Sequence, residues 1–239
     1  MCGMPPSARC GSLATTGRAS GSPRPSQAAP LPCLRARCAR NLDRVCRALI
    51  VCGTSGVGKS SVAAQICQLL THAGAPSAFI DADTLAQFGP APWRHQQAVS
   101  FYDMLKCKNV GSLWPNFRDA GALHLVLAAC VDSRQLREQY ERALEGCVLQ
   151  IVLLIAPPDR LRQRLTGRQR DPFHPTTHAE DGTIREEVLE RVAQEQARLQ
   201  TAGVHDFAVV NDTSPVQAAA RVLKLAGWLA VTDSPETGR

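Results

Sequence analysis

The chain has 239 residues, 44% of them hydrophobic, which is enough apolar material for one α/β domain with a buried core. No stretch approaches the roughly 20 consecutive apolar residues of a membrane-spanning helix, so we expect no membrane partner. The net charge of +6 comes from residues 1–47, which carry eight arginines and a single acid, Asp43. The remaining residues sum to −1, which disfavours a nucleic-acid-binding surface on the domain.

The first 46 residues are basic and rich in Pro, Gly, Ser and Ala, and they show no hydrophobic period. This composition predicts a disordered tail, whereas a transit peptide and a start site nearer Val45 are alternatives that the sequence leaves open. We place the domain at residues 47–232 and expect residues 233–239 to be disordered. The ten cysteines form no C-x-x-C pair and no zinc spacing, as is typical of buried thiols in a cytoplasmic protein.

From residue 48 onward, short apolar runs alternate with longer amphipathic segments. The predicted strands are residues 48–52, 76–81, 123–128, 148–155 and 207–210. The predicted helices are residues 61–70, 94–108, 115–121, 132–144, 158–165, 183–200 and 215–228, with a polar loop at 167–182. This alternation predicts an α/β fold in which a five-stranded parallel sheet carries helices on both faces.

A phosphate-binding motif lies between the first predicted strand and helix. Residues 53–60 read Gly-Thr-Ser-Gly-Val-Gly-Lys-Ser, a full match to G-x-x-x-x-G-K-[ST]. Its glycines permit backbone torsions that turn N–H groups toward phosphate oxygens at the positive end of a helix. Lys59 would bind the β- and γ-phosphates and Ser60 would bind Mg²⁺. The predicted ATP-binding residues are Gly53, Thr54, Ser55, Gly56, Val57, Gly58, Lys59, Ser60 and Ser61.

Two carboxylates, Asp81 and Asp83, follow the second predicted strand at the edge where open α/β sheets bind ligands. One is expected to orient or deprotonate an accepting hydroxyl, and the other, Asp81, to hold Mg²⁺ through water. The alternative is that Asp83 caps a helix beginning at Thr84. The third strand ends at Cys130 without an acidic residue, which disfavours a motor or switch ATPase and favours a small-molecule kinase.

Five arginines, 160, 162, 164, 168 and 170, cluster at the end of a predicted helix and the start of the polar loop. We expect Arg164 and Arg168 to stabilise charge on a transferring phosphoryl group once a lid closes, and Arg160 and Arg162 to face solvent. Asp212 and Thr213 follow the last strand, where they either cap the final helix or lie near the base of the nucleotide.

Over roughly residues 48–230, these motifs make the chain resemble the P-loop group of adenylate, shikimate, gluconate and adenylylsulfate kinases. Residues 51–61 match the phosphate loop, and residues 80–83 are similar to the acidic strand end that adenylylsulfate kinases use near their acceptor. Residues 164–168 resemble the adenylate kinase lid entry, where the first arginine stacks on adenine and the second contacts phosphates. Residues 113–118 and 203–207 are similar to uncharacterised actinobacterial P-loop proteins.

The resemblance implies a three-layer P-loop fold with ATP and Mg²⁺ as cofactors, and it places the acceptor region at residues 84–121. Within that region we expect Arg118, together with Asp83, to bind the acceptor. The sequence therefore predicts an ATP- and Mg²⁺-dependent phosphotransferase acting on a small hydroxyl-bearing metabolite or nucleoside. The alternative is a nucleotide-binding regulatory or partner-binding module with weak ATPase activity and no metabolite transfer.

Overall fold

Short apolar runs form five parallel strands, as predicted. The computed structural model describes residues 45–89, 99–167 and 185–228, which all belong to one compact unit. The strands are β1 (Cys46–Cys52), β2 (Ser77–Asp81), β3 (His124–Ala128), β4 (Cys147–Ile155) and β5 (Phe207–Val210). Their order in the sheet is β2-β3-β1-β4-β5, so the strand that precedes the glycine motif lies in the middle. The predicted terminal segment 233–239, and the tail up to residue 44, lie outside the described residues.

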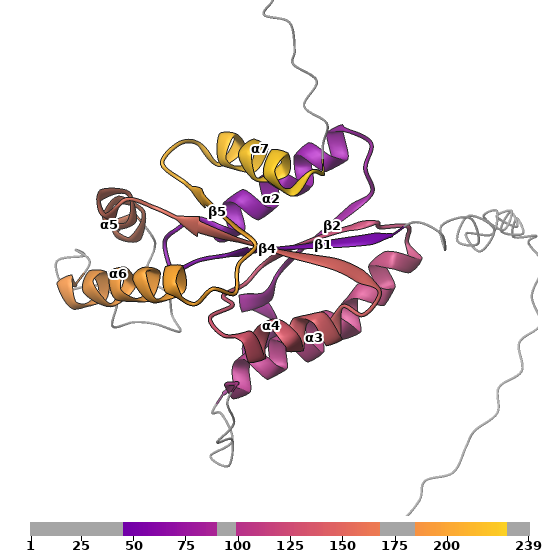
Figure 1. Ribbon diagram of the computed structural model, residues 1–239, viewed down its shortest axis with the longest axis horizontal. Helices are drawn as coiled ribbons and strands as arrows, with labels where there is room; N and C mark the ends of the chain where they lie inside the picture. Colours follow the sequence, from indigo (N-terminus) through magenta and orange to yellow (C-terminus); the bar gives the residue numbers. More distant parts are fainter. Residues whose placement is uncertain (1–44, 90–98, 168–184, 229–239) are drawn as a thin grey trace, which may run out of the picture. The chain divides into compact units, whose positions relative to one another are not determined.

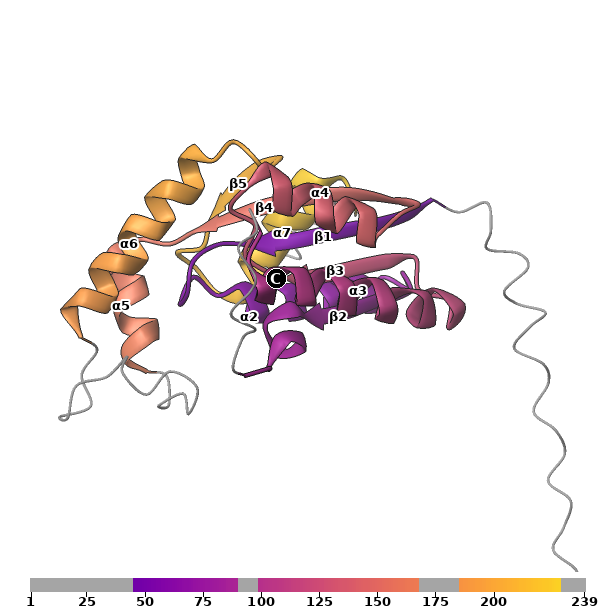
Figure 2. The same cartoon turned by 90° about the horizontal axis from the view of Figure 1, so that it is seen from below.

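The helices cover both faces of the sheet. They are α2 (Lys59–His72), α3 (Phe101–Asp119), α4 (Arg134–Ala143), α5 (Pro158–Thr166), α6 (Glu186–Thr201) and α7 (Pro215–Ala226), with a short 3₁₀ helix η1 (Ala82–Ala86) after β2. Helices α2 and α7 lie on one face and α3 and α4 on the other, while α5 and α6 lie beyond the carboxyl ends of the strands (Figures 1 and 2). None of the helices in the described ranges is long and apolar enough to span a bilayer.

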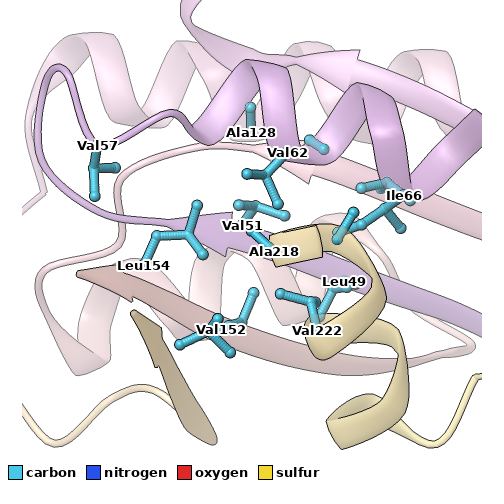
Figure 3. Close-up of a cluster of buried hydrophobic side chains, with 14 of the residues drawn as sticks. Leu49, Val51, Val57, Val62, Ile66, Ala128, Val152, Leu154, Ala218 and Val222 are labelled. Carbon is cyan, nitrogen blue, oxygen red and sulfur yellow. The ribbon is translucent and has the colours of Figure 1, made fainter. Parts of the chain in front are cut away.

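Alternate side chains of each strand fill the two layers of core. On one side, Leu49 and Val51 of β1 contact Val62 and Ile66 of α2 and Val222 of α7, all fully buried (Figure 3). On the other side, the next residues along the strands pack against α3 and α4. Because each buried aliphatic side chain contributes roughly 1.5–3 kcal/mol, the two layers fix the strand register and hence the loops at the strand ends.

Helix α3 differs from the sequence-based expectation. We expected two helices, 94–108 and 115–121, and residues 94–98 of the first lie outside the described residues. A proline is disfavoured in the middle of a helix. The structure shows one helix, Phe101–Asp119, with Pro115 inside it. Its packing explains this result: Trp114 is 3% exposed, and a Cβ on Gly111 would lie 3.2 Å from the carbonyl oxygen of Ala143 in α4. Close packing against α4 therefore stabilises one continuous helix by more than the loss of the hydrogen bond that Pro115 cannot donate.

Candidate phosphate-binding site

The segment between β1 and α2 has the backbone shape that the motif predicts. Gly53, Gly56 and Gly58 have φ angles of 148°, 79° and 99°, a region that side chains with a Cβ rarely adopt. Gly58 is the N-cap of α2 and supplies no side-chain hydrogen bond to the first turn of that helix. The first N–H groups of α2 are therefore directed at the loop, which is how a helix N-terminus binds an anion.

Neighbouring elements leave no room for a side chain at any of these three glycines, and at Gly56 a Cβ would lie 2.8 Å from Cγ of Leu165 in α5. A Cβ on Gly53 would lie 2.8 Å from the carbonyl oxygen of Leu154 in β4. A Cβ on Gly58 would lie 2.7 Å from Nδ2 of Asn211, which follows β5. The loop is thus pressed against the ends of β4 and β5, and its shape depends on the whole sheet.

The two charged or hydroxylated residues that end the motif have defined partners. Lys59 Nζ donates to the carbonyl oxygen of Thr54 at 3.2 Å, so the ammonium group reaches back to the start of the loop. Ser60 Oγ donates to Oδ2 of Asp81 at 2.6 Å. The predicted metal residues, Ser60 and Asp81, therefore lie together at the carboxyl edge of the sheet.

The two aspartates after β2 have different surroundings. Asp81 is the N-cap of η1, because its Oδ1 accepts a hydrogen bond from the N–H of Asp83 at 3.1 Å. The cap that we considered for Asp83 is thus supplied by Asp81. Asp83 instead forms an ion pair with Nζ of Lys106 in α3, at 2.8 Å. Burial lowers the pKa of Lys106, but the hydrogen bond and charge of Asp83, helped by Asp103, outweigh it and raise the pKa above its usual value.

A bound Mg²⁺ fits the Ser60–Asp81 pair. Within the described ranges, no cluster of three His, Cys, Asp or Glu side chains forms a complete metal site. Magnesium is usually held by one or two protein oxygens, with phosphate oxygens and water completing its octahedron. A hydroxyl and a carboxylate 2.6 Å apart, next to a phosphate loop, suit that mode of binding.

Arg164 lies against the phosphate loop, and its hydrogen bonds in the structure go to backbone carbonyls, so its predicted role at the phosphoryl group stays a prediction. Its Nη1 donates to the carbonyl oxygen of Val57 at 2.9 Å, and its Nη2 donates to that of Asn211 at 3.0 Å. Partial burial lowers the pKa of Arg164, and nearby Arg160 adds to the effect. Arg162 forms an exposed pair with Glu186. Arg168 lies outside the described residues.

Asn211 is a loop contact that the sequence analysis missed. It is 1% exposed, and its Nδ2 donates to the carbonyl oxygen of Val57 at 2.7 Å. Asp212 and Thr213, which we expected either to cap the final helix or to lie near the base of the nucleotide, both accept hydrogen bonds from Arg221, at 3.1 and 2.7 Å. Ser214, one residue further along, is the N-cap of α7. Of these residues, the structure brings Asn211 to the phosphate loop.

Glu195 of α6 is a second residue that the sequence analysis missed. The hydroxyl of Thr54, which is 1% exposed, donates to Oε2 of Glu195 at 2.6 Å. Oε1 of Glu195 lies 3.9 Å from Sγ of Cys130, two residues after the end of β3, in the stretch where we noted the lack of an acid. The next residue, Gln196, hydrogen-bonds both backbone groups of Ala156, at 3.0 and 3.1 Å, and so anchors α6 across this edge.

The position of Arg118 requires a correction. Helix α3 starts near Asp83 and runs back across the sheet, so its last residues lie just before β3 begins. Burial raises the pKa of Cys147, at the first position of β4, to about 11, and the charge of Arg118 partly opposes this increase. Arg118 therefore lies at the amino edge, opposite the phosphate loop. Its predicted contact with the acceptor is not supported by this arrangement.

The chain matches no protein-family model and no curated protein. Solved structures do resemble it. The Deinococcus radiodurans tunicamycin resistance protein has a TM-score of 0.52 and 18% identity, covering 76% of this chain and 96% of that one. Shikimate kinase from Bacteroides thetaiotaomicron has a TM-score of 0.51 and 16% identity, and the match covers 76% of this chain and 98% of the kinase. A sugar kinase from Janibacter sp. HTCC2649 has a TM-score of 0.50 and 18% identity, and the match covers 76% of this chain and 95% of the kinase.

At these identities the similarity shows the fold alone. The chain has the fold of P-loop small-molecule kinases, a five-stranded parallel sheet with helices on both faces. The similarity to actinobacterial P-loop proteins stays a prediction.

Proposed function

We propose that this chain is an ATP- and Mg²⁺-dependent phosphotransferase acting on a small hydroxyl-bearing molecule. The observation that carries the proposal is the complete loop. Its glycines have positive φ angles, the Lys59 ammonium is hydrogen-bonded to the carbonyl of Thr54, and Ser60 is hydrogen-bonded to Asp81. The similar structures support the same reading, because two of them are described as a sugar kinase and a shikimate kinase.

Each group of residues at the site has its own role in the proposed transfer. Loop N–H groups and the N-terminus of α2 hold the phosphates, and Lys59 neutralises the β- and γ-oxygens. Ser60 and Asp81 would hold Mg²⁺, which would supply positive charge to offset the negative charge that develops during transfer. Asp83, just after β2, and its partner Lys106 of α3 offer an acceptor and a donor for hydroxyl groups. Positioning and charge neutralisation supply the catalysis, since phosphoryl transfer needs little covalent chemistry from the protein.

The direct test is transfer from Mg-[γ-³²P]ATP to a panel of sugars, polyols, sugar acids and nucleosides, using the full chain. We expect at least one compound to become labelled, and labelling to fall at least 100-fold in Lys59→Ala. Lys108→Ala is the matched control, because Lys108 is exposed on α3. Binding of Mg-ATP without transfer to any compound would favour the nucleotide-binding regulatory module instead.

A further inference from the structure

Glu195 is a partly buried carboxylate in contact with the phosphate loop. Among the described residues it pairs with no lysine or arginine, and its hydrogen bonds come from the Thr54 hydroxyl and the Cys130 thiol. Arg198, one turn along α6, pairs with Asp132 instead, at 3.6 Å. A carboxylate without a cation beside an anion-binding loop weakens phosphate binding, so its position calls for a role in the chemistry.

The contacts place Glu195 at the Thr54 end of the loop, beside the residue that also binds the Lys59 ammonium. Lys59, whose ammonium binds the β- and γ-phosphates in this motif, donates to the carbonyl oxygen of Thr54. The hydroxyl of the same threonine holds Glu195. The opposite end of the loop, at Val57, is held by Arg164 and Asn211. A γ-phosphate held by Lys59 would therefore lie at the Glu195 end of the loop, and an acceptor in line with it would lie there too.

The other two carboxylates at this edge, Asp81 and Asp83, already have hydrogen-bond or ion-pair partners. Asp81 accepts the Ser60 hydroxyl, which assigns it to the metal, and Asp83 is paired with Lys106 at 2.8 Å. A carboxylate in an ion pair is a weaker base than one without a cation. Glu195 has Oε2 fixed by Thr54, and its Oε1 meets only a weak thiol donor among the described residues.

We propose that Oε1 of Glu195 accepts the hydrogen bond of the acceptor hydroxyl and takes its proton during transfer. The acceptor oxygen forms a bond to the γ-phosphorus, and the bond from that phosphorus to the β–γ bridging oxygen breaks to release ADP. The proton on Glu195 then passes to solvent. A hydrogen bond with Cys52, and then burial, raise the pKa of Cys130, so this neighbour stays a neutral thiol.

This inference rests on the proposed function and is tested with water as the acceptor. We would measure single-turnover formation of ADP from Mg-ATP by the full chain, with enzyme in excess, and the dissociation constant of Mg-ADP. General-base assistance is typically worth about 10²–10⁴-fold, so Glu195→Gln should lower ADP formation by at least about 100-fold. Its affinity for Mg-ADP should stay within about threefold of the wild type, because glutamine keeps an oxygen for Thr54.

Glu190→Gln is the matched control, since it makes the same change at an exposed position of α6. It should match the wild type in both measurements. ADP formation by Glu195→Gln within threefold of the wild type would overturn the inference. Equal losses of ADP formation and Mg-ADP affinity would also overturn it, because Glu195 would then only shape the loop. A wild type that binds no Mg-ADP would instead refute the proposed function itself.

Discussion

Arg164 should stabilise the phosphate loop through two hydrogen bonds, and Arg164→Ala tests this. The guanidinium links the carbonyl oxygen of Val57 in the loop to that of Asn211 after β5, at 2.9 and 3.0 Å. Hydrogen bonds to a charged group contribute about 1.5–3 kcal/mol each. The side chain is partly exposed, so we take values near the lower end and expect about 2–4 kcal/mol for the pair.

Urea and thermal unfolding of the full chain measure this effect. In a domain of this size, 1 kcal/mol shifts Tm by about 2–4 °C, so Arg164→Ala should lower Tm by about 4–16 °C. Mg-ATP affinity should fall as well, because the carbonyl of Val57 would then keep, among the described residues, Asn211 as its one side-chain partner. The loss should be less than additive with Asn211→Ala, since both side chains bind that carbonyl.

Arg162→Ala is the control for this experiment. Arg162 lies on the same helix and forms an exposed pair with Glu186, of the kind that contributes little to stability. Equal stability of Arg164→Ala and Arg162→Ala would refute the reasoning, because it would mean that the two bonds to the loop contribute no more than a surface ion pair.

Two further predictions follow from the same geometry. Gly58→Ala should weaken Mg-ATP binding by more than about tenfold in calorimetric titrations, because the new Cβ would lie 2.7 Å from Nδ2 of Asn211. Gly74→Ala is the control. Gly74 also has a positive φ, 71°, but no atom lies near its added Cβ, so this variant should keep the affinity. Because the pKa of Lys106 is raised, its pair with Asp83 should stabilise the fold fully below the ordinary lysine pKa of about 10.4 and lose that effect at higher pH. Unfolding experiments from pH 8 to 11.5 should therefore show a steeper loss in the wild type than in Lys106→Ala; parallel curves would exclude this contribution.

The sheet and the phosphate loop could be predicted because their signals are local. Each strand is a run of apolar residues, and the motif at residues 53–60 is contiguous, with a strand and a helix on either side. The position of Asp81 at the same edge as the loop followed from a topological rule, since the carboxyl ends of parallel strands meet at one edge; its hydrogen bond with Ser60 did not.

The remaining site contacts join residues that are distant in the sequence. Glu195 is 141 positions from Thr54, and Asn211 is 154 positions from Val57, so no local pattern marks either contact. Glu195 lies in an amphipathic helix, and from the sequence an acidic residue in such a helix is expected to lie on the solvent-exposed face. The course of α3 decided the position of Arg118, and Pro115 concealed that course because it suggested two short helices in place of one.

Calorimetric titration of Mg-ATP into the full-length chain tests the central claim most directly. The account predicts saturable binding by the wild type and by Lys108→Ala. It predicts at least tenfold weaker binding, about 1.4 kcal/mol, by Lys59→Ala, because the ammonium group at the loop is its main mobile cation for the phosphates. Equal affinities of the wild type and Lys59→Ala, or no binding by the wild type at millimolar Mg-ATP, would contradict the account.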